Sequence, residues 1–488
     1  MQFPNCILLH LLYRGNESTG PLVANFQACA HQFSKRRFTY DLKQEDRVQA
    51  RARQHTMKRL STISHQITHA GVAREDGASP DDVIICAALR TAITKAKKGG
   101  FKDCYPEDLL ASLMEALLRK TGVDPSLIGD VCIGNVLQPG AGALATRIAM
   151  LLAGLPSSVP VQVVNRQCSS GLQAVATIAA SIRSGFIDIG IGGGVESMSH
   201  FDMMTTLNPE KLSERIFANE QARNCLLPMG LTSENVATKF GITRDVQDRF
   251  AEESHAKSLA AQHDGLFKEE IVPLRVKVRG SDGVEKEVVV DQDEGPRRGT
   301  TVATLARLKP AFQAGGTTTA GNSSQISDGA ALVLLARRSI AQKLGLPCLA
   351  RFVTMAVVGV PPEIMGIGPA VAIPAALDQA RLMVLCAASA AVCLARAELS
   401  MEDVDVFELN EAFASQAAYC VKKLNIPKEK LNPKGGGIAL GHPLGCTGAR
   451  QIATLLPEMR RTKARYGVVS MCIGTGMGAA AVFENLVR

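Results

Sequence analysis

The sequence predicts an α/β protein assembled from two related halves. Short apolar strands alternate with helical segments from residue 82 onward, several of these strands end in glycine or asparagine, and blocks of the first half recur in the second. With 488 residues, of which 46% are apolar and 20% charged, the chain can bury a large core.

The composition disfavours several classes of protein. The 54 basic and 46 acidic residues give a net charge of +8 and are scattered, so no nucleic-acid surface is predicted. Thirteen cysteines without a CxxC pair indicate a reducing compartment rather than a disulfide framework or a zinc site. Because no apolar run reaches 18 residues, no membrane span is predicted.

In the first half, the sequence pattern predicts strands and helices in a regular order. These are a strand over 82–88, a helix over 108–118, a strand over 130–135, an alternating strand from 161 that runs into a turn at 168–171, a helix over 172–182 and a strand over 188–195. Cys168 therefore lies at a strand-to-helix junction.

Charge and loop signals interrupt this rhythm between about 199 and 321, which predicts an inserted loop domain. We accordingly expect a leader over 1–81, a first half over 82–348 that contains the insertion, and a second half over 349–488.

An internal repeat relates the two halves. Asp130-Val-Cys-Ile-Gly-Asn resembles Asp405-Val-Phe-Glu-Leu-Asn, and Cys168-Ser-Ser-Gly resembles Gly445-Cys-Thr-Gly. The spacing agrees, because 194 − 168 and 472 − 446 both equal 26. Two such halves packed together would bring residues near 168, 410, 442 and 472 side by side.

Four blocks can carry chemistry, and each has a simpler interpretation. Cys168 near a helix N-terminus is a candidate nucleophile, or else a small core residue. His442, in Gly441-His-Pro, suits proton transfer, or else bonds to backbone in a loop. Cys472 precedes glycines whose N–H groups could bind an oxyanion, or which otherwise only form a tight turn between strands. Asn410 could hold a water, or else cap a helix.

Taken together, these blocks are far more specific than any one of them. Cys168-Ser-Ser-Gly, Asn410-Glu-Ala-Phe, Gly441-His-Pro and Cys472-Ile-Gly-Thr-Gly resemble, in this order, the active-site blocks of the thiolase family, and the similarity runs from about residue 82 to 488. Further stretches, such as 138–142 and 471–484, resemble its peroxisomal 3-ketoacyl-CoA branch.

The resemblance implies a fold of two duplicated βαβαβαββ halves in five αβαβα layers with an inserted loop domain. It implies that Cys168 is the acylated nucleophile, that His442 takes its proton, and that Cys472 is the second acid/base. Asn410 would hold a water in one oxyanion hole, and the N–H groups of Cys168 and Gly474 would form the other.

The resemblance also implies the ligands and partners. Coenzyme A and acyl-CoA would be substrates, with no permanently bound cofactor and no metal, and Met229, Phe312 and Ser324 fall where the family lines its pantetheine channel. Homodimers, or tetramers built on dimers, are expected. The reaction expected is cleavage of a 3-ketoacyl-CoA by CoA in fatty acid β-oxidation.

Two other functions remain open at this point. One is a short-chain acetoacetyl-CoA thiolase that condenses two acetyl-CoA molecules. The other is a non-catalytic acyl-CoA or lipid-binding protein on the same fold, against which the intact Cys168, His442 and Cys472 argue.

Two segments depart from the family pattern. Residues 57–67 resemble an N-terminal peroxisomal signal, which would need an import receptor, and Met57 as the true start would make 1–56 an annotation artefact; an Arg-rich mitochondrial leader is the alternative. The apolar residues 381–396 intervene where the family continues directly. They are a lengthened helix, a partner or membrane contact, or a translated intron, and we favour the intron.

Overall fold

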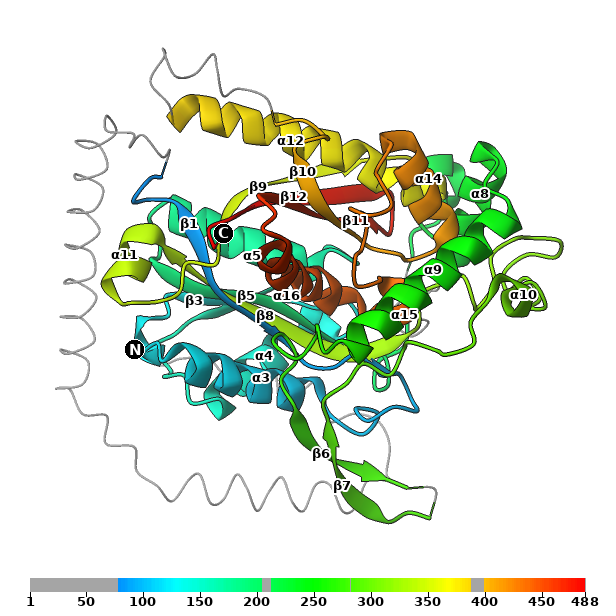
Figure 1. Ribbon diagram of the computed structural model, residues 1–488. Helices are drawn as coiled ribbons and strands as arrows, with labels where there is room; N and C mark the ends of the chain where they lie inside the picture. Colours follow the sequence, from blue (N-terminus) through cyan, green and yellow to red (C-terminus); the bar gives the residue numbers. More distant parts are fainter. Residues whose placement is uncertain (1–77, 204–211, 281, 388–398, 488) are drawn as a thin grey trace. The chain divides into compact units, whose positions relative to one another are not determined.

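A computed structural model describes residues 78–203, 212–280, 282–387 and 399–487 (Figure 1). The expected leader, apart from residues 78–81, and with it the targeting-like segment 57–67, lies outside the described residues. The domain boundaries expected from the sequence remain predictions.

The first half follows the predicted order of strands and helices. Its elements are β1 (Val83–Arg90), β2 (Thr94–Lys95), α3 (Pro106–Thr121), β3 (Asp130–Gly134), α4 (Ala143–Leu152), β4 (Val161–Val164), α5 (Ser170–Arg183), β5 (Ile189–Ser197), β8 (Ser327–Arg337) and α11 (Arg338–Lys343), with short 3₁₀ turns at Pro125–Leu127 and Pro139–Gly142. Strand β3 pairs in parallel with β4 and β5, whereas β8 is antiparallel to both β5 and β1.

The second half repeats this topology. Its elements are β9 (Ala350–Gly359), a 3₁₀ turn (Pro362–Ile367), α12 (Gly368–Ala387), β10 (Val404–Leu409), α14 (Ala414–Leu424), α15 (Gly437–Leu440), α16 (Leu444–Thr462), β11 (Tyr466–Ile473) and β12 (Met477–Asn485). Strands β10 and β11 are parallel, and β12 is antiparallel to β11 and β9. An isolated parallel bridge, Phe407 to Leu431, takes the place that β4 has in the first half.

The two half-sheets join along their first strands. Ile84 and Ile85 of β1 lie opposite Arg351 and Ala350 of β9 in antiparallel register. The strands therefore form one continuous order, β10-β11-β12-β9-β1-β8-β5-β3-β4, with the short β2 paired to β8.

Helices α5 and α16 form the middle layer of the fold. They contact each other and lie between the two groups of strands (Figure 1). A single apolar cluster joins Leu172 and Ile178 of α5, Ile452 and Leu455 of α16, and side chains from β1, β11 and β12. Helix α3 covers the outer face of the first half and α12 and α14 that of the second, so the predicted five layers are confirmed.

Glycines allow the two central helices to approach closely. A Cβ atom added to Gly171 would lie 2.5 Å from the carbonyl oxygen of Gly445, and one added to Gly448 would lie 2.5 Å from the backbone nitrogen of Leu172. Because no side chain fits between the backbones, the N-terminal ends of α5 and α16 meet at one place. Cys168 precedes α5, and His442 precedes α16.

The segment between β5 and β8 is rich in helices. It contains α6 (Arg215–Ala218), α7 (Glu220–Asn224), α8 (Met229–Phe240), α9 (Arg244–His263), the hairpin β6 (Leu274–Arg279) and β7 (Glu285–Val290), and α10 (Val302–Leu305).

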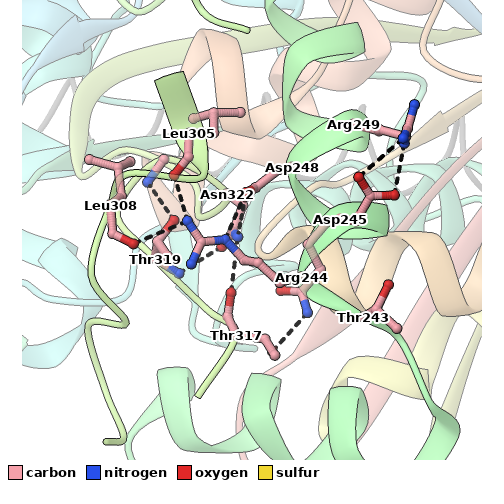
Figure 2. A network of polar contacts seen from close by, with 12 residues as sticks. Thr243, Arg244, Asp245, Asp248, Arg249, Leu305, Leu308, Thr317, Thr319 and Asn322 are labelled. Carbon is pink, nitrogen blue, oxygen red and sulfur yellow. Dashed lines mark hydrogen bonds and ion pairs between the residues drawn. The ribbon is translucent and has the colours of Figure 1, made fainter. Parts of the chain in front are cut away.

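Figure 2 shows how helix α9 fixes the returning loop of this segment. Asp248 accepts hydrogen bonds from Arg244 Nε at 2.7 Å and from Asn322 Nδ2 at 2.9 Å. The carbonyl of Asn322 in turn accepts from the N–H of Ala414 at 2.9 Å, at the start of α14. The loop segment is thus tied to the turn that follows Asn410.

A buried cluster of charges links the first half, the loop segment and the second half. Glu270, which is fully buried, accepts from Arg90 Nε at 2.7 Å, Lys434 Nζ at 2.7 Å and Thr454 Oγ1 at 2.8 Å. Asp293 pairs with the other end of Arg90 through two bonds of 2.7 and 2.8 Å. Every charge in this cluster therefore has an opposite partner, which burial requires.

Helix α12 extends as far as Ala387 and thus into the apolar segment 381–396 that departs from the family pattern. Residues 388–396 lie outside the described residues. Among the helices that the structure describes, none is long and apolar enough to cross a membrane.

Substituting Glu270→Ala leaves the buried Arg90 and Lys434 without a shared carboxylate. We expect the free energy of unfolding in urea to fall by about 3–5 kcal/mol, because an uncompensated buried charge is costly. The matched control is Lys428→Ala, which breaks the exposed pair with Glu253 and should cost less than about 1 kcal/mol. Equal losses for the two variants would contradict the linking role of Glu270.

Candidate active site

The turn before α5 presents Cys168. Gln167 adopts a left-handed backbone with φ of 48°, and the turn is closed by Arg166 N–H donating to Ser170 Oγ at 2.9 Å and by Ser170 Oγ–H donating to the Gln167 carbonyl at 2.6 Å. Cys168 is only partly buried, so it is not simply a core residue.

Two backbone N–H groups point at the Cys168 thiol, one from Gly474 and one from Cys168 itself. Burial raises the pKa of the Cys168 thiol to about 11; these N–H groups lower it, and the negative charge of Glu196 raises it further. The resting group is therefore a thiol, and a base must remove its proton for attack.

Cys472 lies at the end of β11, immediately before the turn to β12. Thr475 and Gly476 in this turn have φ values of 69° and 96°, and the turn carries the N–H of Gly474 to Cys168. Cys472 is fully buried, and burial, followed by the charge that Cys168 carries when it is ionised, raises the pKa of its thiol well above the ordinary value. The two thiols thus lie near each other, and Cys472 is held in its protonated form.

His442 is fixed by the tight loop before α16. Gly441 has φ of 109°, and the His442 N–H donates to the Gln325 carbonyl at 3.0 Å. The ring contacts side chains rather than backbone: Nδ1 lies 2.6 Å from Thr447 Oγ1. Burial, with a smaller effect from Arg450, lowers the pKa of His442 to about 3, so the imidazole is neutral at physiological pH.

Asn410 faces this imidazole from the end of β10. Its Nδ2 lies 3.4 Å from His442 Nε2 and can only donate, which places a lone pair on Nε2 and the ring proton on Nδ1, toward Thr447. Asn410 does not cap α14, because Phe413 is the N-cap. Its buried Oδ1 has no hydrogen-bond partner within the described residues and can receive a water or a ligand group.

Glu411 holds the glycine-rich loop that leads to His442. Its buried carboxylate accepts from Ile438 N–H at 3.2 Å and from Asn432 Nδ2 at 2.7 Å. A Cβ on Gly436 would lie 2.3 Å from its carboxyl carbon, so this loop requires glycine there. The block after β10 therefore positions His442 as well as Asn410.

The three residues expected to line the substrate channel lie beside this site. A Cβ on Gly474 would lie 3.6 Å from Met229 Sδ. Phe312 is 43% exposed, and its ring meets the ring of Phe413 edge to face at 6.1 Å. Ser324 donates its N–H to the Ala412 carbonyl at 2.9 Å.

Sequence reasoning identified the four blocks but missed the side chains that support them. Thr447 contacts the His442 ring, Glu411 the loop that leads to His442, and Glu196 the first turn of α16. Glu411 and Thr447 belong to the blocks Asn410-Glu-Ala-Phe and Gly445-Cys-Thr-Gly, and Glu196 follows the glycine-rich stretch 188–195, but no pattern in the sequence indicates what they contact. In the described part of the chain, no cluster of three or more histidine, cysteine or acidic residues could hold a metal ion.

Comparison with known families agrees with this geometry. The family model described as "Thiolase, N-terminal domain" matches residues 83–339, and the one described as "Thiolase, C-terminal domain" matches residues 381–485. The chain belongs to the thiolase family. This thiolase is accordingly an acyltransferase.

Two curated relatives show how extensive the similarity is. The human protein named peroxisomal 3-ketoacyl-CoA thiolase is 57% identical over 408 residues, which cover 83% of this chain and 92% of the human one. The peroxisomal 3-ketoacyl-CoA thiolase of Yarrowia lipolytica is 53% identical and covers 87% of this chain and 99% of its own.

Two solved structures resemble this thiolase to a similar degree. The dimeric peroxisomal thiolase of Saccharomyces cerevisiae superimposes with a TM-score of 0.73 at 48% identity, covering 84% of this chain and 98% of the yeast one. The acetyl-CoA acetyltransferase of Bacillus anthracis gives the same TM-score at 37% identity, with coverages of 83% and 99%.

Alkylation tests the protonation state of Cys168. With a pKa of about 11, its rate of reaction with iodoacetamide should rise about tenfold for each pH unit from about pH 7 to pH 9, because only the thiolate reacts. Peptide mass spectrometry identifies the modified residue, and Cys168→Ala protein is the control. A plateau by about pH 8 would show that the resting group is already a thiolate.

Proposed function

We propose that this thiolase is a 3-ketoacyl-CoA thiolase that uses CoA to cleave a 3-ketoacyl-CoA into acetyl-CoA and an acyl-CoA shortened by two carbons. The observation that carries the proposal is the meeting of two thiols, Cys168 and Cys472, with the Asn410–His442 pair in one site. The names of the relatives supply the substrate class.

The first half-reaction uses Cys168 as the nucleophile. Neutral His442 takes the thiol proton on Nε2 as Sγ attacks the 3-keto carbon, so the thiolate and the imidazolium form together and stabilise each other. The bond between carbons 2 and 3 then breaks. The acyl group stays on Cys168 as a thioester, and the departing acetyl-CoA enolate takes a proton from Cys472.

The second half-reaction restores both cysteine thiols. The Cys472 thiolate removes the proton of the incoming CoA thiol, and the CoA sulfur attacks the acyl carbon on Cys168. The shortened acyl-CoA leaves, and Cys168 recovers its proton from the His442 imidazolium. Both cysteines end as thiols, so no external acid or base is consumed.

Hydrogen-bond donors support the charges that develop in these steps. The N–H groups of Cys168 and Gly474, which point at the thiol, suit the oxygen that becomes negative when Sγ attacks. Asn410, beside His442, suits the thioester oxygen of the enolate, directly or through a water. Thr447 would hold the His442 ring in the orientation that these steps need.

The substrate enters as a CoA thioester, and CoA is a substrate rather than a resident cofactor. Met229, Phe312 and Ser324 would line the pantetheine channel, since each packs against or bonds to the segment Ala412–Phe413. The chemistry derived above uses only thiols, an imidazole and amides.

The enzyme acts in fatty acid β-oxidation in the peroxisome, in line with the names of its relatives. It is a homodimer, by likeness to the dimeric yeast structure. Recognition of residues 57–67 by an import receptor is part of the proposal and concerns residues that the structure does not describe.

A second candidate is a short-chain acetyl-CoA acetyltransferase. It is favoured by the bacterial acetyl-CoA acetyltransferase, which superimposes as well as the yeast peroxisomal thiolase. The overall backbone therefore does not separate the two activities, and substrate chain length must do so.

Thiolysis of a long-chain 3-ketoacyl-CoA and of acetoacetyl-CoA, measured side by side, tests the proposal. We expect turnover of both, with the higher kcat/KM for the long chain. Cys168→Ala should reduce either activity by about a thousandfold or more, because the acyl acceptor is lost, and should leave CoA binding in place. Turnover of acetoacetyl-CoA alone would favour the second candidate, and undiminished turnover by Cys168→Ala would contradict the mechanism.

A further inference from the structure

Glu196 is a buried carboxylate that the mechanism does not use. It lies at the C-terminal end of β5 and is fully buried. In the part of the chain that the structure describes, no lysine or arginine pairs with it. Its partners are instead the N–H groups of Val136, Leu137 and Gly445 and the side-chain amide of Asn135.

The arrangement of these donors defines the charge state of Glu196. Oε1 accepts from Leu137 N–H at 3.1 Å and from Asn135 Nδ2 at 3.2 Å. Oε2 accepts from Val136 N–H at 3.0 Å and from Gly445 N–H at 2.9 Å. With two donors on each oxygen and no acceptor opposite, a carboxyl proton would face an N–H group. Burial raises the pKa of Glu196 to about 7 in spite of these four donors, so the ionised carboxylate that the geometry fits is the main form above neutral pH.

Of these four bonds, the one from Gly445 connects the two halves of the protein. Val136 and Leu137 follow β3 of the first half, whereas Gly445 opens the first turn of α16 in the second half, three residues after His442. Gly445 is tightly packed, because a Cβ atom added to it would lie 2.7 Å from Asn135 Cα and 3.0 Å from Glu196 Oε2.

Glu196 also acts on Cys168 through its charge. It raises the pKa of the Cys168 thiol, and that of Cys446 on α16, as a nearby anion must. The group that anchors the helix of the base is thus also the anion that disfavours a free thiolate on the nucleophile.

We propose that Glu196 is a positioning residue of this active site: its ionised carboxylate fixes the N-terminus of α16, and with it His442, against the Cys168 turn, and it places a negative charge near the Cys168 thiol. The inference rests on the roles of Cys168 and His442 in the proposed function. It gives a reason for burying a carboxylate without a cation, a costly arrangement that packing alone does not need.

The substitution Glu196→Gln tests both effects at once. The NH₂ of glutamine would face two N–H donors, so one side of the anchor is lost, and so is the charge. We expect kcat for thiolysis to fall by about tenfold or more through displacement of His442, with KM for CoA changed by less than about twofold. In the same protein the pH midpoint of Cys168 alkylation should move down, because a neighbouring anion has been removed.

Two further variants complete the test. Glu196→Asp keeps the charge but withdraws it by one methylene, so kcat should fall while the alkylation midpoint stays near that of the wild type. The control is Asp130→Asn, a half-buried carboxylate at the opposite end of β3, which should change neither value.

Each outcome decides the question. Wild-type kcat in Glu196→Gln overturns the inference, and so does a lower kcat with an unchanged alkylation midpoint, which would indicate a purely structural carboxylate. If Glu196→Gln does not fold, as judged by circular dichroism, Glu196→Asp decides, and wild-type kcat there overturns the inference. A wild-type protein without thiolysis activity would refute the proposed function instead, and alkylation would still test the charge effect on Cys168.

Discussion

The close contact between helices α5 and α16 is the constraint on which the rest of the molecule depends. Gly171 of α5 and Gly194 of the neighbouring β5 both lie against the carbonyl of Gly445 in α16, at distances that leave no room for a side chain. Cys168 lies two residues before the start of α5 in one half, and His442 lies two residues before the start of α16 in the other. The seam between the duplicated halves is thus also the place to which the proposed nucleophile and the proposed base are brought.

Buried polar groups hold this seam and its loops in register. Glu270 ties the loop segment to both halves, Glu411 holds the glycine loop before His442, and Glu196 holds the first turn of α16. Each carboxylate is surrounded by donors, which limits the cost of removing it from water. A site that requires two thiols and an imidazole in fixed relation is therefore built on neighbours that cannot easily move.

Much of this could be predicted from the sequence. Local patterns predict the order of strands and helices, the duplication, and the four blocks around Cys168, Asn410, His442 and Cys472. Hydrophobic periodicity and turn residues involve only residues that are close together in the sequence. The supporting contacts could not be predicted. Thr447 is an ordinary helix residue until α16 places it against Nδ1, and Glu196 meets Gly445 249 residues away. Such contacts depend on the packing of two distant halves, to which a single sequence gives little access.

In the proposed mechanism, Cys168 carries the acyl group between two half-reactions. Mixing the enzyme with a long-chain 3-ketoacyl-CoA in the absence of free CoA, followed by acid quenching and peptide mass spectrometry, tests it most directly. We expect one acyl group, shortened by two carbons, on the peptide that contains Cys168, together with one equivalent of released acetyl-CoA. An acyl group on another residue, or acetyl-CoA release without any acylated peptide, would contradict it.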